Sequence, residues 1–243
     1  MSRVVLRCLA LLVALLVLPA QAVTYTFNTS GNPAVSGISS ICSGNWNRTG
    51  GSTFTCDGDL STASGDVLTV SSATTITVNA RRITLTGTTV GATDRTINLR
   101  ATSNPITATN STVIGTLTAT SGSISLTGGS VSGLVLSNCC AITTNGTNLS
   151  GGARSDSNRL SITGGALQGP FYAGNNPATF TGVNMLSGSV SGASTITFND
   201  STLGSPTSYV AVTSANGPVS LNTTTAYGNF TAPGSSTIEV NSP

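Results

Sequence analysis

The sequence predicts an all-β protein, a parallel β-solenoid (β-helix) of about nine coils with an eighteen-residue repeat and a small disulfide-stapled N-terminal cap. Three observations predict this fold. Apolar residues recur every eighteen positions, apolar and polar residues alternate over short segments within each repeat, and Gly, Asn and Ser turns separate these segments. Strands this short must stack on their own copies to bury an apolar face, which gives one coil per repeat.

Residues 1–22 are typical of a secretory signal peptide. Arg3 and Arg7 supply the positive charge, an apolar run spans residues 9–18, and an Ala-Gln-Ala cleavage site ends at Ala22. The apolar run is about half as long as a membrane-spanning helix requires. We therefore expect an exported mature chain that begins at Val23, has no membrane span, and is extracellular, on the cell surface or in the periplasm.

Residues 23–66 are expected to form the N-terminal cap. Cys42 and Cys56 enclose a loop rich in Gly and Asn, and an oxidising compartment favours a disulfide between them. That bridge would contribute about 3 kcal/mol by the loop-entropy estimate. Asp57, Asp59 and Asp66 form the one acidic cluster, but they lack the aspartate-rich repeat of calcium-binding β-rolls, so we expect turn residues and no metal site.

Residues 67–243 are assigned to the solenoid repeats. The first inward position recurs every eighteen residues at Ile106, Ile124, Ile142, Leu160, Ala178 and Ile196. Nine residues after these positions, a glycine appears in four consecutive repeats, at Gly115, Gly133, Gly151 and Gly169. The pattern resumes at Val219 after a five-residue insertion. Coils about 4.8 Å apart would give a rod on the order of 40 Å long, and eighteen residues permit two or three faces per coil.

The outward positions of the expected strands carry short polar side chains. Stacked coils would align these side chains into two ladders of hydroxyls and amides on one flat face. The twelve ladder residues are Thr107, Thr109, Ser125, Thr127, Thr143, Asn145, Ser161, Thr163, Thr179, Thr181, Thr197 and Asn199. Two interpretations stay open: the ladders stabilise the sheet, since Thr is a good polar strand former, or they form an ordered array that meets ice or a glycan.

Cys139 and Cys140 are adjacent in the sequence. They are either two reduced thiols in a turn or a redox-sensitive vicinal bridge or intermolecular link. No His or third Cys is available to complete a tetrahedral metal shell with them.

The charge content argues against several classes of protein. Of 243 residues, 7% are charged, and neither His nor Lys occurs. Nucleic-acid binding requires clustered Lys and Arg, so no nucleic-acid partner is expected. Catalysis near neutral pH usually uses His, a tuned Lys or grouped carboxylates. Asp94, Asp156 and Asp200 do not share a repeat position. They therefore assemble no stacked acid site of the kind that solenoid polysaccharide lyases and hydrolases use, and we expect no enzymatic activity and no cofactor.

The sequence resembles MshQ-like proteins, which are large exported proteins associated with the mannose-sensitive haemagglutinin (MSHA) pilus locus of Gram-negative bacteria. Residues 25–27, 42–44, 54–56 and 65–70, which read YTF, CSG, FTC and GDVLTV, resemble the start of these proteins. The repeats AITTNG and LSITGG, which begin at Ala141 and Leu160, look like their bactofilin-like solenoid region. The resemblance implies a part in pilus biogenesis and brings no catalytic residues.

MshQ-like proteins continue into long C-terminal segments, whereas this sequence stops at Pro243. We expect a truncated member, a fragment of a split gene, or a member whose open end docks a partner.

These observations predict a secreted, non-enzymatic structural or adhesive protein. Its expected partners are other surface or pilus proteins, or a second copy that pairs with the C-terminal coil edge at residues 219–240. One alternative is an ice-binding protein that uses the Thr/Ser ladders. Another is a glycan-binding adhesin, for which Trp46, Phe171, Tyr172 and Tyr209 would offer stacking surfaces.

Overall fold

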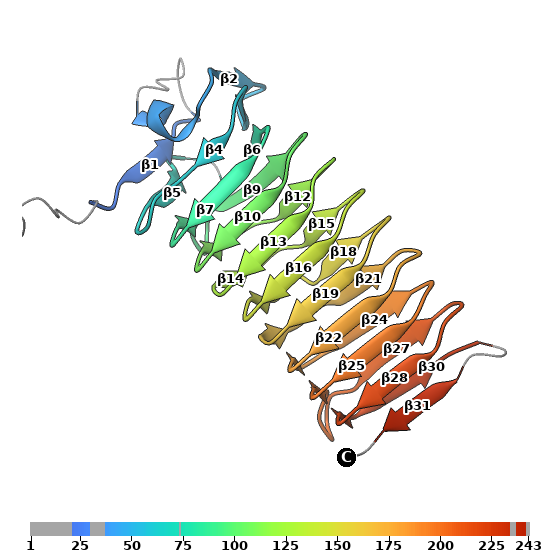
Figure 1. Cartoon of the computed structure of the whole chain (residues 1–243). Helices are drawn as coiled ribbons and strands as arrows, with labels where there is room; N and C mark the ends of the chain where they lie inside the picture. Colours follow the sequence, from blue (N-terminus) through green and yellow to red (C-terminus); the bar gives the residue numbers. More distant parts are fainter. Residues whose placement is uncertain (1–20, 30–36, 73, 234–236, 242–243) are drawn as a thin grey trace, which may run out of the picture.

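The computed structural model describes residues 21–29, 37–72, 74–233 and 237–241. Most of the predicted signal peptide, residues 1–20, lies outside this range. The chain winds as a rod-shaped parallel β-solenoid from the N-terminal to the C-terminal end (Figure 1). The predicted fold class and eighteen-residue repeat are confirmed, and the stack has about ten coils where the sequence predicted about nine.

Each coil contributes one strand to each of three sheets, so the rod has three faces. Sheet A contains β1 (Thr24–Phe27), β5 (Val67–Val70), β8 (Thr89–Val90), β11 (Thr112–Val113), β14 (Ser130–Val131), β17 (Asn148–Leu149), β20 (Ala166–Leu167), β23 (Asn184–Met185), β26 (Thr202–Leu203) and β29 (Thr225–Ala226). Sheet B contains β4 (Leu60–Ser61), β7 (Ile83–Thr86), β10 (Ile106–Thr109), β13 (Ile124–Thr127), β16 (Ile142–Asn145), β19 (Leu160–Thr163), β22 (Ala178–Thr181), β25 (Ile196–Asn199), β28 (Val219–Asn222) and β31 (Ile238–Asn241).

Sheet C forms the third face. It contains β2 (Trp46–Thr49), β3 (Thr53–Cys56), β6 (Thr75–Ala80), β9 (Thr96–Ala101), β12 (Leu117–Ala119), β15 (Val135–Ser137), β18 (Ala153–Ser155), β21 (Pro170–Ala173), β24 (Gly188–Gly192), β27 (Val210–Ser214) and β30 (Gly228–Thr231). Only the pairing of β2 with β3 is antiparallel among the described strands. A short 3-10 helix, η2 (Ser39–Ile41), precedes β2.

The inward residues form one continuous apolar spine along the rod. In sheet B, Ile106 pairs with Ile124 and Ile124 with Ile142, and all three are fully buried. Towards the C-terminal end the spine becomes aromatic. Phe180 stacks on Phe198 with ring centroids 4.8 Å apart. Burial of this spine is the main force that holds the coils together, because each coil alone has too little apolar surface to fold.

The repeated glycines lie where the chain turns from sheet A to sheet C. A Cβ atom placed on Gly151 would lie 2.3 Å from the carbonyl carbon of Gly133 in the preceding coil. A Cβ on Gly133 would likewise lie 2.6 Å from the carbonyl oxygen of Gly115. Successive coils therefore touch backbone to backbone at this corner, which explains the regular spacing of glycine in the sequence.

The N-terminal region is joined to the solenoid by hydrogen-bonded strands. Cys42 and Cys56 form the predicted disulfide, with their Cα atoms 5.8 Å apart. The rings of Phe27 and Phe54 lie 5.0 Å apart, and the Phe27 ring lies 5.7 Å from that of Trp46 in β2. Strands β1, β3 and β4 pair with β5, β6 and β7, so residues 23–29 and 37–66 form a first, irregular coil that covers the end of the spine.

Candidate functional site

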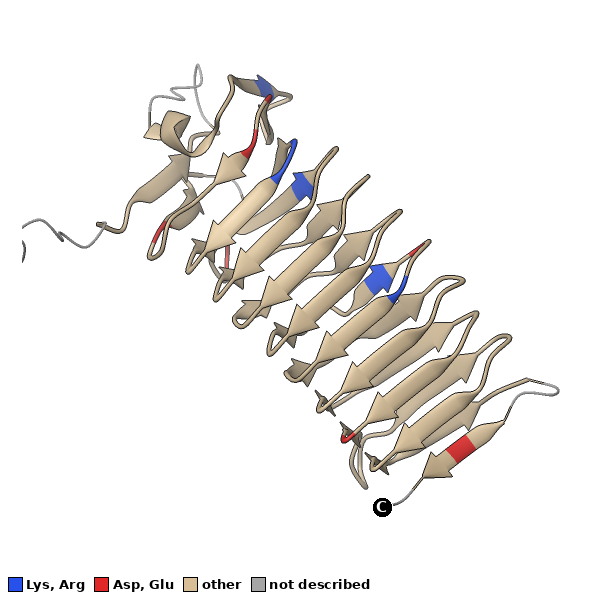
Figure 2. Cartoon of the chain, in the orientation of Figure 1, with Lys and Arg blue, Asp and Glu red and all other residues tan. Residues whose placement is uncertain are grey.

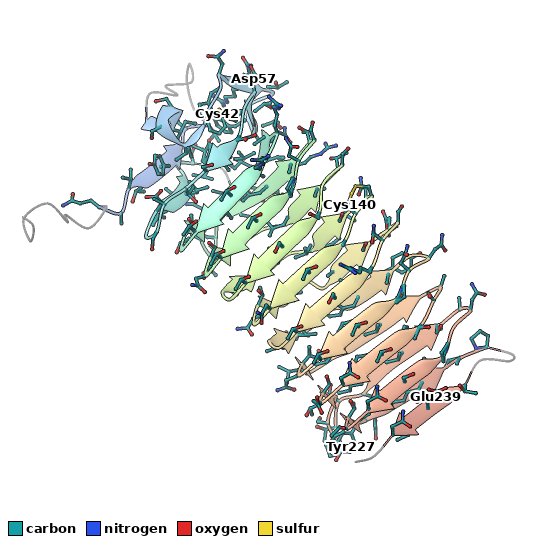
Figure 3. The ribbon with its side chains drawn as sticks, in the orientation of Figure 1. Cys42, Asp57, Cys140, Tyr227 and Glu239 are labelled. Carbon is teal, nitrogen blue, oxygen red and sulfur yellow. A yellow bond between two sulfur atoms is a disulfide. The ribbon has the colours of Figure 1, made fainter. Side chains whose placement is uncertain are left out.

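The outward face of sheet B carries the predicted ladders. Thr107 pairs in register with Ser125, and Ser125 with Thr143, while Thr109, Thr127 and Asn145 align two residues further on. The same register continues through the other six predicted residues, which are Ser161, Thr163, Thr179, Thr181, Thr197 and Asn199. All twelve residues thus lie on one face (Figure 3), spaced about 4.8 Å along the rod and about 6.8 Å across it.

Two neighbouring coils extend these ladders. Thr84 and Thr86 of β7 align with Thr107 and Thr109, and Ser220 and Asn222 of β28 continue the ladders at the other end. The eighteen-residue spacing does not predict Thr84 and Thr86, because Ile83 and Ile106 are 23 residues apart. Aligning the alternating Ile-Thr-Leu-Thr of β7 directly with β10 would have found them.

The two ends of the ladder differ in hydrogen bonding. Near the C-terminal end, the Asn222 amide donates to Asn199 Oδ1 at 2.8 Å, and the Asn241 amide donates to Asn222 Oδ1 at 2.8 Å. Three stacked asparagines thus form an amide ladder that stabilises the sheet. Asn145 has Thr127 and Thr163 as neighbours and joins no such ladder. In the described structure, the ladder hydroxyls of Thr107, Ser125, Thr127 and Thr143 make no side-chain hydrogen bond to each other, and all four residues are exposed to solvent.

Sheet B is almost free of charge. Glu239 in β31 is the one charged residue within its described strands, and the Arg and Asp residues lie elsewhere on the rod (Figure 2). A surface of this kind offers neutral hydroxyl donors and acceptors in a regular array. It can bind a neutral, hydrogen-bonding surface, but it has no means to attract a charged polymer from a distance.

Cys139 and Cys140 lie at the corner between sheets C and B, and their sulfur atoms are bonded to each other. The corner is fixed by buried serine hydroxyls. Ser137 Oγ accepts from the Cys140 amide at 3.1 Å and donates to the Gly122 carbonyl of the preceding coil. Ser155 Oγ in the next coil donates to the Cys140 carbonyl. Both cysteines are partly exposed, so a reductant can reach the bridge.

A shallow hollow of about 720 Å³ opens beside this corner. Its lining residues are Ala141, Asn158, Arg159, Leu160, Ser161, Asn176, Pro177 and Thr179. Ser161 and Thr179 belong to the predicted ladders, so the hollow adjoins the hydroxyl face. Arg159 has no carboxylate within ion-pair distance among the described residues. The sequence pattern does not predict this hollow, because two turns that only the stacking of coils brings together form it.

Arg154, Asp156 and Tyr172 form a small cluster on the outer side of sheet C. Arg154 Nε donates to Asp156 Oδ1 at 2.5 Å, and the guanidinium carbon lies 5.2 Å from the Tyr172 ring centroid. The hydrogen bond from Arg154 to Asp156, and then the charge of Asp156, raise the pKa of Arg154 above its ordinary value. Because the pair is exposed to solvent, it contributes little to stability.

The four aromatic residues considered for glycan stacking differ in exposure. Phe171 is fully buried in the spine, so the expectation that it offers a stacking surface is wrong. It occupies an inward position of β21, whereas its neighbour Tyr172 points outward. Trp46 is half-buried, and its indole N–H donates to the Ile38 carbonyl at 2.8 Å. Tyr172 and Tyr209 are exposed, on separate coils.

The predicted edge, residues 219–240, spans β28 to β31. Ile238 and Val240 continue the inward register of Val219 and Leu221, yet they are 45% and 68% exposed, whereas Val219 and Leu221 are buried. The C-terminal end of the described rod therefore exposes these two apolar side chains. It also leaves one edge unpaired in each sheet, at β29, β30 and β31 (Figure 1).

The described part of the chain holds no helix long and apolar enough to cross a membrane. Within the same residues, no three His, Cys, Asp or Glu side chains gather in a group that could hold a metal ion. Comparison of the chain with models of protein families, with curated proteins and with solved structures gave no match in any of the three.

Proposed function

We propose that this chain is a secreted, non-enzymatic structural and adhesive protein that forms a rigid rod within a cell-surface assembly. The observation that carries the proposal is the C-terminal coil, where Ile238 and Val240 leave the apolar spine open. An open coil accepts a further strand through its free backbone groups and buries these side chains at the same time. The resemblance to MshQ-like proteins supports a place in MSHA-type pilus biogenesis.

The proposed partner at this edge is a second copy of the chain. Two copies related by a two-fold axis would pair β31 with β31 and bury Ile238 and Val240 of both chains. The other end of the rod is covered by the cap, so such pairing closes as a dimer and does not continue into a filament. A dimer would display two hydroxyl faces along one longer rod.

Sedimentation velocity of the mature chain tests this pairing. We expect Ile238→Lys and Val240→Lys each to weaken self-association at least about tenfold, since burying an unpaired ammonium at the contact is costly. Tyr209→Lys, which places the same charge at a similarly exposed aromatic residue on another coil, is the matched control and should leave association unchanged. A capping coil bearing charges or proline, added after Pro243, should abolish association. Equal association of the capped and native chains would exclude pairing at this edge.

The cellular role is tested by shearing producing cells and probing the pilus, surface and soluble periplasmic fractions. Recovery of the chain with sheared pili or surface material is the expected result. A freely soluble monomer in the periplasm would contradict the assembly role and favour a function of the hydroxyl face alone.

Ice binding by sheet B is the second candidate function. It is favoured by one observation, the uncharged two-ladder array in strict register from β7 to β25. Under this hypothesis Thr127→Lys with Thr163→Lys abolishes thermal hysteresis and leaves the fold and any dimer intact. Absence of thermal hysteresis in the native chain would reject ice binding directly.

A further inference from the structure

The backbone nitrogen of Val23 lies 3.0 Å from Oδ1 of Asp66. Val23 is the first residue after the predicted cleavage site and, among the described residues, the first for which a hydrogen bond to the rest of the fold is found. Its carbonyl accepts from the Val67 amide at 2.9 Å, and β1 begins at the next residue. Gln21 and Ala22 are exposed to solvent. The position at which the fold begins therefore coincides with the position at which the sequence predicts processing.

Asp66 is the carboxylate that this nitrogen meets, and it is only 3% exposed. Its Oδ2 accepts from the Ala63 amide at 2.7 Å. Both hydrogen-bond donors found for the carboxylate are neutral amides, and none of the ion pairs among the described residues involves Asp66. Before processing, no cation among the described residues thus lies within ion-pair distance of this buried carboxylate.

We propose that Val23 is a processing site whose cleavage completes the fold: hydrolysis of the Ala22–Val23 peptide bond converts the Val23 amide into an α-ammonium group, which forms a half-buried ion pair with the buried carboxylate of Asp66. Water supplies the hydroxyl to the Ala22 carboxyl and the hydrogen to the new amine, which is protonated at neutral pH. The neutral hydrogen bond becomes a charge-assisted one, which is about twice as strong.

The consequence is a strand that becomes fixed after export. Strand β1 is the first strand of sheet A and pairs only with β5 among the described strands. Phe27 of β1 packs on Phe54, so the ion pair at the start of β1 also holds the aromatic cluster of the cap. In the precursor the strand is held less firmly, which suits a chain that must pass unfolded through an export channel.

Labelling of primary amines tests the ion pair directly, because the sequence contains no Lys and the mature chain then has its α-amino group as the sole primary amine. The chain is exported and purified, its N-terminal residue is read by mass spectrometry, and it is treated with an N-hydroxysuccinimide ester. We expect Val23 as the first residue. We also expect labelling at least about tenfold slower than in Asp66→Asn, because a neighbouring carboxylate favours the charged, unreactive amine. Asp94→Asn, at an exposed aspartate, is the control and should label like the native chain.

A second measurement does not depend on the folding of the Asp66 variant. A chain that retains Gln21 and Ala22 keeps Asp66 but places a neutral amide at Val23. Amide hydrogens of β1 should exchange about fivefold faster in this extended chain than in the chain that begins at Val23. An N-terminus at another residue, equal labelling of the native and Asp66→Asn chains, or equal exchange with and without the extension would each overturn the proposal.

Discussion

Replacing Gly151 with alanine tests whether backbone contact between coils sets the spacing of the rod. The added Cβ would lie 2.3 Å from the carbonyl carbon, 2.6 Å from the oxygen and 2.8 Å from the Cα of Gly133. The shortest of these distances is about 1 Å less than the 3.4 Å at which ordinary contact begins. All three atoms belong to the backbone, so no side chain can rotate away, and the two coils must separate at this corner.

The free energy of unfolding should fall by about 3 kcal/mol. Overpacking of a well-packed site costs about 1–3 kcal/mol, and separation also stretches neighbouring hydrogen bonds such as Ser150 N–H to the Val131 carbonyl, now 3.0 Å. For a chain of this size the midpoint of thermal unfolding should then fall by about 6–12 °C. Far-UV circular dichroism during heating measures this midpoint.

Gly146→Ala is the matched control. Gly146 has φ of +67° and no atom within 4 Å of an added Cβ, so alanine there costs only the left-handed backbone conformation, about 1 kcal/mol. Because only the Cβ at residue 151 meets the preceding coil, Gly151→Ala should be clearly more destabilising than Gly146→Ala. If both variants lose the same stability, the glycine column reflects turn conformation and not coil contact.

Three further predictions concern the cap, the corner between sheets C and B, and the core. Cys42→Ser with Cys56→Ser should destabilise the cap by about 3 kcal/mol in urea unfolding followed by Trp46 fluorescence, since that bridge spans 14 residues. Cys139→Ser with Cys140→Ser should change stability by less than about 0.5 kcal/mol, because adjacent cysteines close almost no loop; a large loss would contradict this. Thr144→Val should raise the free energy of unfolding by about 1 kcal/mol, since its buried hydroxyl has no hydrogen-bond partner, and a loss would indicate an internal water there.

The sequence was sufficient to predict the repeat and its inward and outward positions, but not the features that arise only when the coils stack. The alternation within each strand and the eighteen-residue spacing placed Ile106, Ile124 and Ile142 inward and their Thr and Ser neighbours outward. The direction of these side chains was predictable because it follows from the sequence of the strand itself. The outward Thr84 and Thr86 of β7 were not assigned to the ladders, since an insertion displaces this coil by five residues from the eighteen-residue spacing. Three faces could not be told from two, because that number depends on how the chain bends at turns whose sequences vary between coils.

The candidate site was likewise predictable where it depends on the repeat, and not where it depends on how the turns stack. All twelve ladder residues lie where the repeat places them, whereas the hollow beside Arg159 required the turns of two coils to be stacked in space. Phe171 was predicted to offer a stacking surface because aromatic residues bind sugars well. The alternation of exposed and buried residues along β21 instead places Phe171 at an inward position. The pairing of Val23 with Asp66 joins residues 43 positions apart in the least regular part of the chain, where no repeat applies.

The covered N-terminal end and the open succession of coils have a consequence for the order of assembly. Each described coil pairs only with the coils before and after it, so every strand from β5 onwards finds a partner in residues already synthesised. Under the proposed export, the cap with its Cys42–Cys56 disulfide is the first part of the mature chain to leave the secretion channel. The cap then serves as a template, and each later coil adds to the edge of the coil before it, in the order in which the chain is translocated. Folding in this order avoids the contacts between distant residues that slow the folding of most β proteins.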